Sequence, residues 1–464
     1  MLKILIFVVL FVSGCTVGPD FEKKDVYEDV QIAQSLKLNG CGLKIEPTWY
    51  HDFQDETLNA LIERASASNP SVLIGIERLK QARTALFVAK TQYLPAFNAS
   101  GSYDYMKASD NTPLSANTNY FSAGFDASWE IDLWGAGRRL NESLSAKTQE
   151  AYYSLQNITV AIVAETANTY FSLKTTQEKL NIAQNNLALQ SDIFKSIKDK
   201  YLAGLEDEAA FRQAKYLLED TKAKIFALKH QIKAYQNALA VLTGNLPENL
   251  PEGVFKTTNN PIKKAYRFEK NKLYDLPIDI IRTRPDVKAQ EKAMVAQNAA
   301  IGQAVAAVYP NVSVSALFGF QSSAGSKLFS SSGKTYGYEP SAVLPIFHWG
   351  ALEKQIELEK QKMAETYQNY RQTLLNAISE LSNAIDAVQK SYAQNRFQQN
   401  ATNNMRKAFS AMREKYESGL IEYAALLTTE QNLLSSEMAL IESNGAVYQN
   451  IIAFYKATGG GYNQ

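Results

Sequence analysis

The sequence has few of the side chains on which metal sites and disulfide frameworks depend. It contains two cysteines and three histidines, and His51, His230 and His348 lie far apart along the chain. So sparse a set does not make a metal cage, and two cysteines cannot form a disulfide scaffold. We therefore expect no metal ion and no dissociable cofactor in this protein.

Neither sign of charge is in excess. Lysine and arginine number 48 against 47 aspartates and glutamates, which gives a formal net charge of +1. Nucleic acid binding requires a basic face, and this balance indicates no nucleic acid partner. The paired carboxylates Glu130 and Asp132 lie in a water-facing alternating segment rather than among convergent catalytic groups. We therefore expect that the protein is not an enzyme.

The apolar run at the N-terminus is too short to cross a bilayer. Ile4 to Val12 are nine apolar residues, whereas a membrane-spanning helix needs about 20. This run predicts a signal peptide over residues 1–14. The small residues Ser13 and Gly14 before Cys15 resemble a bacterial lipoprotein box, which predicts an acylated Cys15 as the first mature residue. Thr16, where an aspartate would favour the inner membrane, indicates the outer membrane.

The most informative segment runs from Tyr120 to Gly137, where the periodicity of the sequence changes. The odd positions are apolar: Phe121, Ala123, Phe125, Ala127, Trp129, Ile131 and Leu133. The even positions are polar or small: Ser122, Gly124, Asp126, Ser128, Glu130 and Asp132. Such alternation predicts a strand with one apolar and one polar face. After Trp134-Gly135 a helical spacing begins, and no proline follows until Pro247.

The same segment occurs twice, at a constant difference in residue number. Trp134-Gly135 is matched by Trp349-Gly350, and we call the difference between these numbers the repeat offset. The repeat offset also pairs Pro70 with Pro285, Pro95 with Pro310, Glu165 with Glu380, Tyr201 with Tyr416, Gly204 with Gly419, Leu205 with Leu420 and Thr243 with Thr458. An offset that does not drift indicates an internal duplication.

Each repeat contains two alternating strands that read as a hairpin. Four strands cannot close a barrel, because the smallest membrane barrels use eight, so the strands imply assembly of several chains. A coiled-coil seam then predicts a long helix over 136–201. Its roughly 66 residues would extend about 100 Å. Gly204 marks a tight turn before a returning helix, and Gly419 marks the equivalent turn in the second repeat.

The predicted organisation follows from these elements. It comprises a signal peptide 1–14, an acylated N-terminal arm 15–55, repeat one 56–243, a connector 244–276, repeat two 277–458 and a C-terminal tail 459–464. Repeat one holds a first helix 56–68, a hairpin at about 95–133, a long helix 136–201 and a return helix 208–243, and repeat two holds a hairpin at about 310–348, a long helix 351–416 and a return helix 423–457. Cys41 lies in a glycine-rich loop of the arm and is expected to be an unpaired bystander, with a reactive thiol as the alternative.

Taken in order, the motifs resemble those of the TolC-like outer-membrane efflux proteins, in particular their lipoprotein branch. The resemblance rests on Cys15 to Phe21, Trp49 and Phe53, Asn69-Pro70, Tyr93-Leu94-Pro95, Trp129 to Gly135, Arg284-Pro285-Asp286, Leu344 to Phe347 and Trp349-Gly350. It implies a mixed α and β membrane fold. In a homotrimer, four strands per chain would form a twelve-stranded transmembrane barrel, continued by a helical coiled-coil tunnel through the periplasm.

The resemblance also implies a function and partners. The chain would be the outer-membrane channel of a tripartite efflux system, passively conducting drugs or other small toxic compounds. Its partners would be a periplasmic adaptor, an inner-membrane pump of the resistance-nodulation-division type and outer-membrane lipid. Two alternatives remain open: the outer duct of a type I protein-secretion system, and a non-channel periplasmic scaffold lipoprotein.

Candidate site residues follow from the same interpretation. The polar strand residues expected to face the lumen are Ser122, Asp126, Ser128, Glu130 and Asp132, and those expected to face lipid are Phe121, Phe125, Trp129 and Ile131. The candidate periplasmic aperture comprises Tyr201, Gly204, Asp207, Tyr416, Gly419, Glu422, Leu426 and Leu427. The carboxylate ring of relatives does not transfer, because Ala425 and Thr428 occupy the aligned positions. Two interpretations of the aperture are open. One is local negative charge from Glu422, or from Glu206, Asp207 and Glu208 in repeat one, with Arg212 or Arg413 as partners. The other is an apolar constriction at Leu426 and Leu427.

Overall fold

The computed structural model describes residues 16–23, 28–36, 38, 45–107, 118–255, 262, 264–268 and 273–461. The predicted signal peptide, Cys15 and Cys41 lie outside the described residues, so acylation of Cys15 stays a prediction. Within the described part, the chain forms two compact units. One comprises the described residues among 1–24, 77–152 and 289–372, and the other the described residues among 25–76, 153–288 and 373–464.

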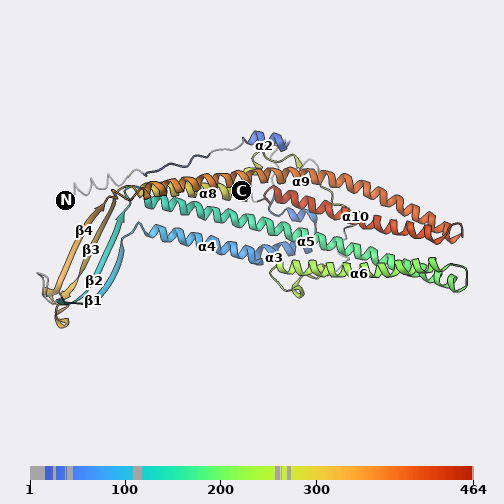
Figure 1. Cartoon of the computed structure of the whole chain (residues 1–464), viewed down its shortest axis with the longest axis horizontal. Coiled ribbons are helices and arrows are strands. Elements are labelled where there is room, and N and C mark those ends of the chain that lie inside the picture. The colour runs from blue at the N-terminus through green and yellow to red at the C-terminus, as the bar shows by residue number, and fades with distance from the viewer. Residues whose placement is uncertain are drawn as a thin grey trace. The chain divides into compact units, whose positions relative to one another are not determined.

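The helices and strands follow the predicted order (Figure 1). The helices are α2 (Asp29–Leu36), α3 (Glu56–Ser68), α4 (Pro70–Thr91), α5 (Ala136–Leu202), α6 (Glu208–Leu242), α7 (Ile280–Thr283), α8 (Pro285–Ala306), α9 (Ala351–Glu417) and α10 (Tyr423–Ala457). The strands are β1 (Ala96–Met106), β2 (Thr118–Ile131), β3 (Asn311–Ser322) and β4 (Lys334–Val343). Short 3-10 helices cover Trp49–Phe53, Pro247–Asn249, Glu252–Val254, Gly325–Lys327 and Ser331–Gly333.

The duplication is visible in the helix bounds. α4 and α8 have 22 residues each, α5 and α9 have 67 each, and α6 and α10 have 35 each. In all three pairs the first residues, and likewise the last residues, are separated by the repeat offset. Two copies of one ancestral pattern have therefore kept the same lengths, although their side chains now differ at most positions.

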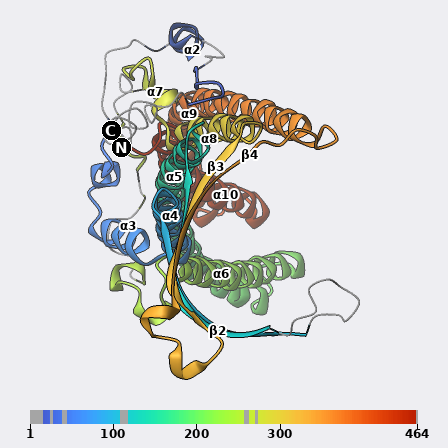
Figure 2. The ribbon, with the colours of Figure 1, turned by 90° about the vertical axis from the view of Figure 1, so that its left-hand side faces the viewer.

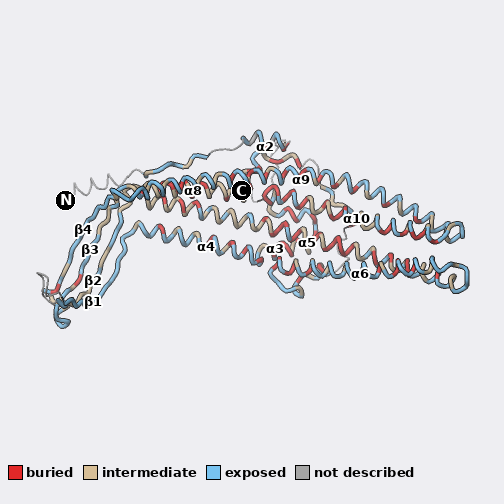
Figure 3. Tube along the Cα trace, viewed as in Figure 1, coloured by how far each residue is buried: buried red, intermediate tan, exposed pale blue. Residues whose placement is uncertain are grey.

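The first unit contains a curved four-stranded antiparallel sheet in the order β1-β2-β3-β4 (Figures 1 and 2). β2 and β3 come from different repeats and pair with each other, with Phe121 opposite Ser322 and Ile131 opposite Val312. Of the residues in these strands, Gly319 is the single buried one, and Figure 3 shows the sheet mostly exposed or intermediate. A sheet with neither face covered by its own chain requires a partner or a membrane on at least one face.

Both hairpins end earlier than the alternation of the sequence suggests. β2 ends at Ile131, and β4 ends at Val343, so the predicted extensions to Leu133 and beyond Leu344 are wrong. Asp132 leaves the strand because its carboxylate caps the first turn of α5. Pro345 cannot donate a ladder hydrogen bond, which disfavours further pairing after Val343.

The second unit is held by apolar side chains between helices. Near the ends of the long helices, Ile197, Leu217, Phe409 and Leu426 pack in one buried cluster. Farther along the unit, Asp55 caps α3 by accepting from the backbone N–H groups of Thr57 and Leu58 at 3.0 and 3.1 Å. Its other oxygen accepts from the Tyr170 hydroxyl at 2.7 Å. These contacts fix the segment before α3 against α5.

The two repeats use different side chains for the same structural task. Asn69 Nδ2 donates to the Leu242 carbonyl at 2.8 Å, and Arg284 Nη1 donates to the Ala457 carbonyl at 2.9 Å. The two donors are separated by the repeat offset, and so are the two acceptors. Both side chains therefore satisfy a carbonyl at the end of a return helix, a group that has no partner within its own helix. Arg284 also pairs with Asp286 at 2.7 Å and Glu380 at 2.8 Å.

Candidate functional site

The strand register brings like side chains together on each face of the sheet. Cross-strand partners share a face. On one face Phe97 pairs with Ala127, Ala127 with Ala316, and Ala316 with Tyr338. On the other face the next row joins Ala96, Ser128, Ser315 and Glu339. The alternation seen in β2 alone therefore extends across the sheet as one largely apolar and one largely polar surface.

The polar surface contains an internal hydrogen-bond network. Asn98 Nδ2 donates to Asp126 Oδ2 at 2.9 Å. The hydroxyls of Ser102 and Ser122 lie 2.8 Å apart, and Ser102 also donates to Asp104 at 2.6 Å. These hydrogen bonds orient the polar groups without covering them with protein. Ser122, Asp126, Ser128 and Glu130 thus lie on one face, as the sequence predicts.

Asp132 does not belong to that face. Its Oδ1 accepts from the Gly137 N–H at 3.1 Å, and its Oδ2 accepts from the Arg138 N–H at 2.9 Å. An acidic side chain at this place satisfies N–H groups of the first helical turn and interacts favourably with the helix dipole. The interpretation of Asp132 as a strand residue facing a lumen is therefore corrected to a cap of α5.

The opposite surface exposes large apolar side chains. Phe125, near the centre of β2, is 65% exposed. Trp129 is also exposed, and its Nε1 donates to the Tyr93 carbonyl at 2.9 Å. Exposed aromatic side chains in a continuous band mark an interaction surface rather than a water-facing one. A polar tip with an apolar body is typical of tryptophan at a membrane interface.

The arm that follows Cys15 is fixed where β2 passes into α5. The Val17 N–H donates to the Trp134 carbonyl at 3.1 Å. Arg139, a buried side chain, donates to the Val17 carbonyl at 3.2 Å and to Asp20 Oδ1 at 2.8 Å. A side chain on Gly302 would collide with Arg139, because an added Cβ would lie 2.7 Å from Nε. Residues 16–20 are thus held close to the base of the sheet.

The turns of the two helical hairpins have the predicted glycines. Gly204 and Gly419 adopt left-handed conformations, with φ of +73° and +71°, which glycine adopts without strain. Asp207 caps α6 by accepting from the Ala210 N–H at 2.7 Å. Glu422 occupies the equivalent position before α10, but its side chain makes no capping hydrogen bond. The longer glutamate side chain is a poorer cap than aspartate.

The arginines near these turns pair within their own helices. Arg212 Nη2 lies 3.0 Å from Glu208, and Arg413 Nε lies 2.8 Å from Glu417. Both pairs are exposed and join residues four apart. The expected charge partners are therefore confirmed in repeat one, where Arg212 pairs with Glu208, whereas Arg413 pairs with Glu417 of its own helix and not with one of the predicted carboxylates.

Tyr201 and Tyr416 are equivalent by sequence and differ in what they contact. The Tyr201 ring stacks on Phe211 of the same hairpin, with centroids 5.0 Å apart. The Tyr416 hydroxyl lies 3.4 Å from Lys200 Nζ, and that ammonium lies 4.8 Å from the Tyr416 ring centroid. The Lys200–Tyr416 contact therefore links α5 to α9, that is, one hairpin to the other. Sequence reasoning missed Lys200, although it directly precedes Tyr201.

Leu426 and Leu427 belong to the core and not to an aperture. They are 1% and 9% exposed, and they pack with Ile197, Leu217 and Phe409 between the helices of their own chain. Side chains used in this way cannot line a pore. The apolar constriction suggested by the sequence is therefore corrected to helix packing.

A buried polar pair that the sequence did not single out lies beside this core. Glu430 of α10 is 1% exposed, and Gln190 of α5 is also buried. Within the described part of the chain, neither carboxylate oxygen of Glu430 and neither polar atom of the Gln190 amide has a hydrogen-bond partner. Burial raises the pKa of Glu430 to about 7, and the nearby Gln190 only partly opposes this shift.

Two features are absent from the described residues. These residues contain no cluster of three or more histidine, cysteine, aspartate or glutamate side chains that could hold a metal ion. In the same residues, the helices lack any segment that combines the length and hydropathy of a membrane span.

Comparison with known proteins gives consistent matches over nearly the whole chain. The family described as Outer membrane efflux protein matches residues 61–245 and 276–460, two ranges that are separated by the repeat offset at both ends. The chain is 26% identical over 465 residues to the cation efflux system protein CusC of Escherichia coli O6:H1, covering 100% of this chain and 99% of CusC. It is 26% identical to nodulation protein T of Rhizobium leguminosarum bv. trifolii, covering 83% and 81% of the two chains. The structure of the outer-membrane channel OprN superimposes with a TM-score of 0.87 at 27% identity, covering 97% of this chain and 100% of OprN.

Proposed function

The chain belongs to the outer membrane efflux protein family, and from that premise we propose how its surfaces carry out the family's task. It is the outer-membrane channel of a tripartite efflux system. Its fold is that of the trimeric channels, in which the strands form a barrel and the helices a tunnel. Conduction through such a duct is passive, since a barrel and a tunnel contain no source of energy.

The two-faced sheet is the observation that carries the proposal. β1 pairs only with β2, and β4 only with β3, among the described residues. Two open edges on a sheet with an apolar face are unstable in a membrane, because unpaired backbone groups there cost several kcal/mol each. Pairing β1 of one copy with β4 of the next closes a twelve-stranded barrel. Ser122, Asp126, Ser128 and Glu130 then face a wet lumen, and Phe125 faces lipid.

We further propose that Cys15 bears the acyl chains of a bacterial lipoprotein. The support is positional: Thr16 packs on Gly135, where an added Cβ would lie 2.8 Å from Thr16 Cγ2. A lipid on the preceding residue would therefore start at the base of the sheet. The chains would enter the same membrane as the strands and add affinity of about 0.8 kcal/mol per buried CH₂.

The family works with a periplasmic adaptor and an inner-membrane pump. We propose that the adaptor docks on the hairpin turns, where Leu205 and Leu420 are exposed beside Gly204 and Gly419. We also propose a pump of the resistance-nodulation-division type and a cargo of drugs or other small toxic compounds. The relatives carry names as different as cation efflux and nodulation, which is consistent with selection of cargo mainly by the pump.

The function is tested by single-channel recording on the purified full-length protein in a planar bilayer, with its mass in detergent measured by light scattering. We expect the mass of a trimer and discrete conductance steps. A trimer without conductance steps under any condition would contradict the channel, and a monomer would favour the scaffold alternative.

Tyr416→Ala is expected to increase the open probability of that channel. The substitution removes both contacts of Lys200 with the ring and hydroxyl of Tyr416, a polar link between the two hairpins beyond their shared apolar cluster. Such contacts contribute about 0.5–1 kcal/mol each when partly exposed, and the two together about 1–2 kcal/mol, so we expect a rise of roughly fivefold to thirtyfold in the ratio of open to closed time. Single-channel dwell times measure this ratio.

Tyr201→Ala is the matched control for that variant. Tyr201 occupies the equivalent position, but its ring stacks within one hairpin. Its dwell times should stay close to those of the unmodified protein. Equal dwell times for both variants would show that the Lys200–Tyr416 link does not restrain the aperture.

A further inference from the structure

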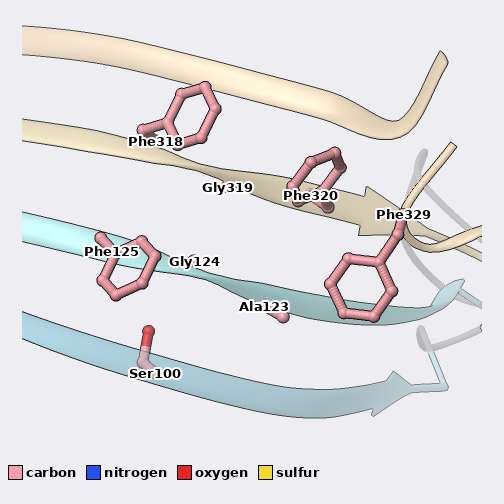
Figure 4. A pocket seen from close by; sticks show the side chains of 8 residues that line it. All are labelled: Ser100, Ala123, Gly124, Phe125, Phe318, Gly319, Phe320 and Phe329. Atoms are coloured by element: carbon pink, nitrogen blue, oxygen red, sulfur yellow. The ribbon is translucent and has the colours of Figure 1, made fainter. Parts of the chain in front are cut away.

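The apolar face of the sheet contains a groove that the channel function does not use. Its walls are the rings of Phe125, Phe318, Phe320 and Phe329, and its lining includes Ala123, Gly124, Gly319 and Ser100 (Figure 4). The volume is about 270 Å³. We name it the phenylalanine groove. It lies on β2 and β3, the inner strands of the sheet, so the strand edges that pair with other copies leave it open.

One wall comes from outside the strands. Phe329 belongs to the connection between β3 and β4, and its ring lies 5.4 Å from that of Phe320. The connection is closely folded at Gly333, where an added Cβ would lie 2.6 Å from the Leu328 carbonyl oxygen. Phe329 is nevertheless 72% exposed, and Phe318 is 52% exposed. The groove is thus shaped by the chain and not filled by it.

The edge of the groove is basic and rich in hydroxyl groups. The connection 323–333 contains five serines and Lys327, and Lys334 begins β4 opposite Phe320 in the register. Residues 323–334 include no aspartate or glutamate. Neither lysine forms an ion pair within the described part of the chain. Two lysines without an ion pair among the described residues therefore belong to the segments that border the groove, Lys334 opposite Phe320 and Lys327 two residues before Phe329.

The position of the groove in the membrane identifies its environment. It lies toward the connection between β3 and β4, at the end of the strands away from the start of α5. In outer-membrane barrels the longer connections face the exterior. The groove therefore opens to the hydrocarbon of the outer leaflet, and the two lysines lie at the level of its head groups. Basic side chains at that level attract anionic lipid head groups.

We propose that the phenylalanine groove binds one acyl chain of the phosphorylated glycolipid of the outer leaflet, with its phosphate held by Lys327 and Lys334. The proposal rests on the outer-membrane location of the channel. The rings supply an apolar slot for the chain, the lysines supply the charge complementary to phosphate, and the serines supply donors for sugar hydroxyls. A neutral phospholipid lacks the net charge that the lysines complement.

Native mass spectrometry of the detergent-purified, full-length trimer tests the site. The probes are bisphosphorylated lipid A, dephosphorylated lipid A and phosphatidylethanolamine, each added at increasing concentration. We expect up to three copies of bisphosphorylated lipid A per trimer. The other two lipids should bind at least tenfold more weakly.

The variants separate charge from shape. The double substitution Lys327→Glu with Lys334→Glu should lower lipid A affinity at least tenfold, and Phe329→Ser should lower it for the phosphorylated and dephosphorylated forms alike. Lys107→Glu is the control for charge reversal, because Lys107 follows β1 outside the groove; it reverses one ammonium group where the double variant reverses two. Its affinity should match that of the unmodified trimer.

Two results would overturn the proposal: equal affinity of the double variant and the Lys107→Glu control, or equal binding of all three lipids. Conductance is recorded on the same preparations. A conducting trimer without selectivity for lipid A would contradict the lipid site and support the channel. A protein that binds lipid A selectively but never conducts would support the lipid site and contradict the channel.

Discussion

Phe125→Arg is expected to abolish assembly of the trimer in the outer membrane. Phe125 is the eighth of the 14 residues of β2 and is largely exposed on the apolar face, which places it near the centre of the bilayer. An arginine on the lipid face at the midplane costs about 2–4 kcal/mol. The cost recurs in each of the three subunits, and the barrel cannot close unless all three insert.

The measurement is the amount of heat-modifiable trimer in isolated outer membranes, together with resistance to a substrate of the efflux system. Ser128→Arg is the control, since it introduces the same side chain three residues away on the polar face. That variant should assemble and change the ion selectivity of the channel. If Phe125→Arg assembles as well as Ser128→Arg, the assignment of Phe125 to the lipid face is contradicted; failure of Ser128→Arg alone would show that the two faces are reversed.

The helices could be predicted closely because their signals are local. α3 and α10 begin and end at the residues that the pattern indicates, and α5 extends only one residue beyond Tyr201. Asn69-Pro70, Gly204 and Gly419 interrupt the helical spacing at points where backbone geometry leaves little choice. The repeat offset then allowed each boundary in one repeat to be checked against the other.

The sequence predicted which strand residues share a face of the sheet, but it did not predict the residues at which the strands end. The alternation of polar and apolar residues continues in the sequence through Asp132 and Leu133, although the backbone has already left β2 and turned toward α5. Whether a carboxylate lies on a strand or caps a helix depends on N–H groups five or six residues later, and periodicity does not report that geometry. The same limit applies after Val343, where the apolar register continues without a partner strand.

The hairpin ends show why apolar pattern alone cannot identify an aperture. By residue type alone, Leu426 and Leu427 fit a pore constriction and a helix core equally well. The structure places them among Ile197 of α5 and Phe409 of α9, which belong to other helices of the chain. Arg139 and Lys200 were missed for the same reason, since each acts on a segment that is distant along the chain.

The stability of the helical unit is expected to fall as pH rises toward neutrality, because of Glu430. Its pKa is about 7 in the folded chain against an ordinary value of 4.5. The native state therefore retains a proton that the unfolded chain has lost, and stability decreases between these two pH values. The stability that the folded chain gains from protonated Glu430 is fully present below about pH 4.5 and is lost above about pH 7. The difference between the two pKa values corresponds to about 3 kcal/mol.

Glu430→Gln should remove that dependence, because an amide of nearly the same shape does not ionise. We expect the variant to unfold at a higher temperature than the unmodified protein at pH 8 and at a similar temperature at pH 5. Thermal unfolding followed by circular dichroism in detergent measures the difference. Gln190 and Tyr423 face the same buried carboxyl, so both remain unchanged in the comparison.

Glu422→Gln is the control for Glu430→Gln. It removes a carboxylate eight residues earlier on the same polypeptide segment, at an exposed position without a capping hydrogen bond, and should leave the pH dependence intact. If the unfolding temperatures of Glu430→Gln and of the unmodified protein depend on pH in the same way, Glu430 is ionised in the folded protein without a loss of stability. A water or a partner subunit would then have to supply the hydrogen bonds that its own chain does not provide, since an unpaired buried carboxylate is too costly to persist.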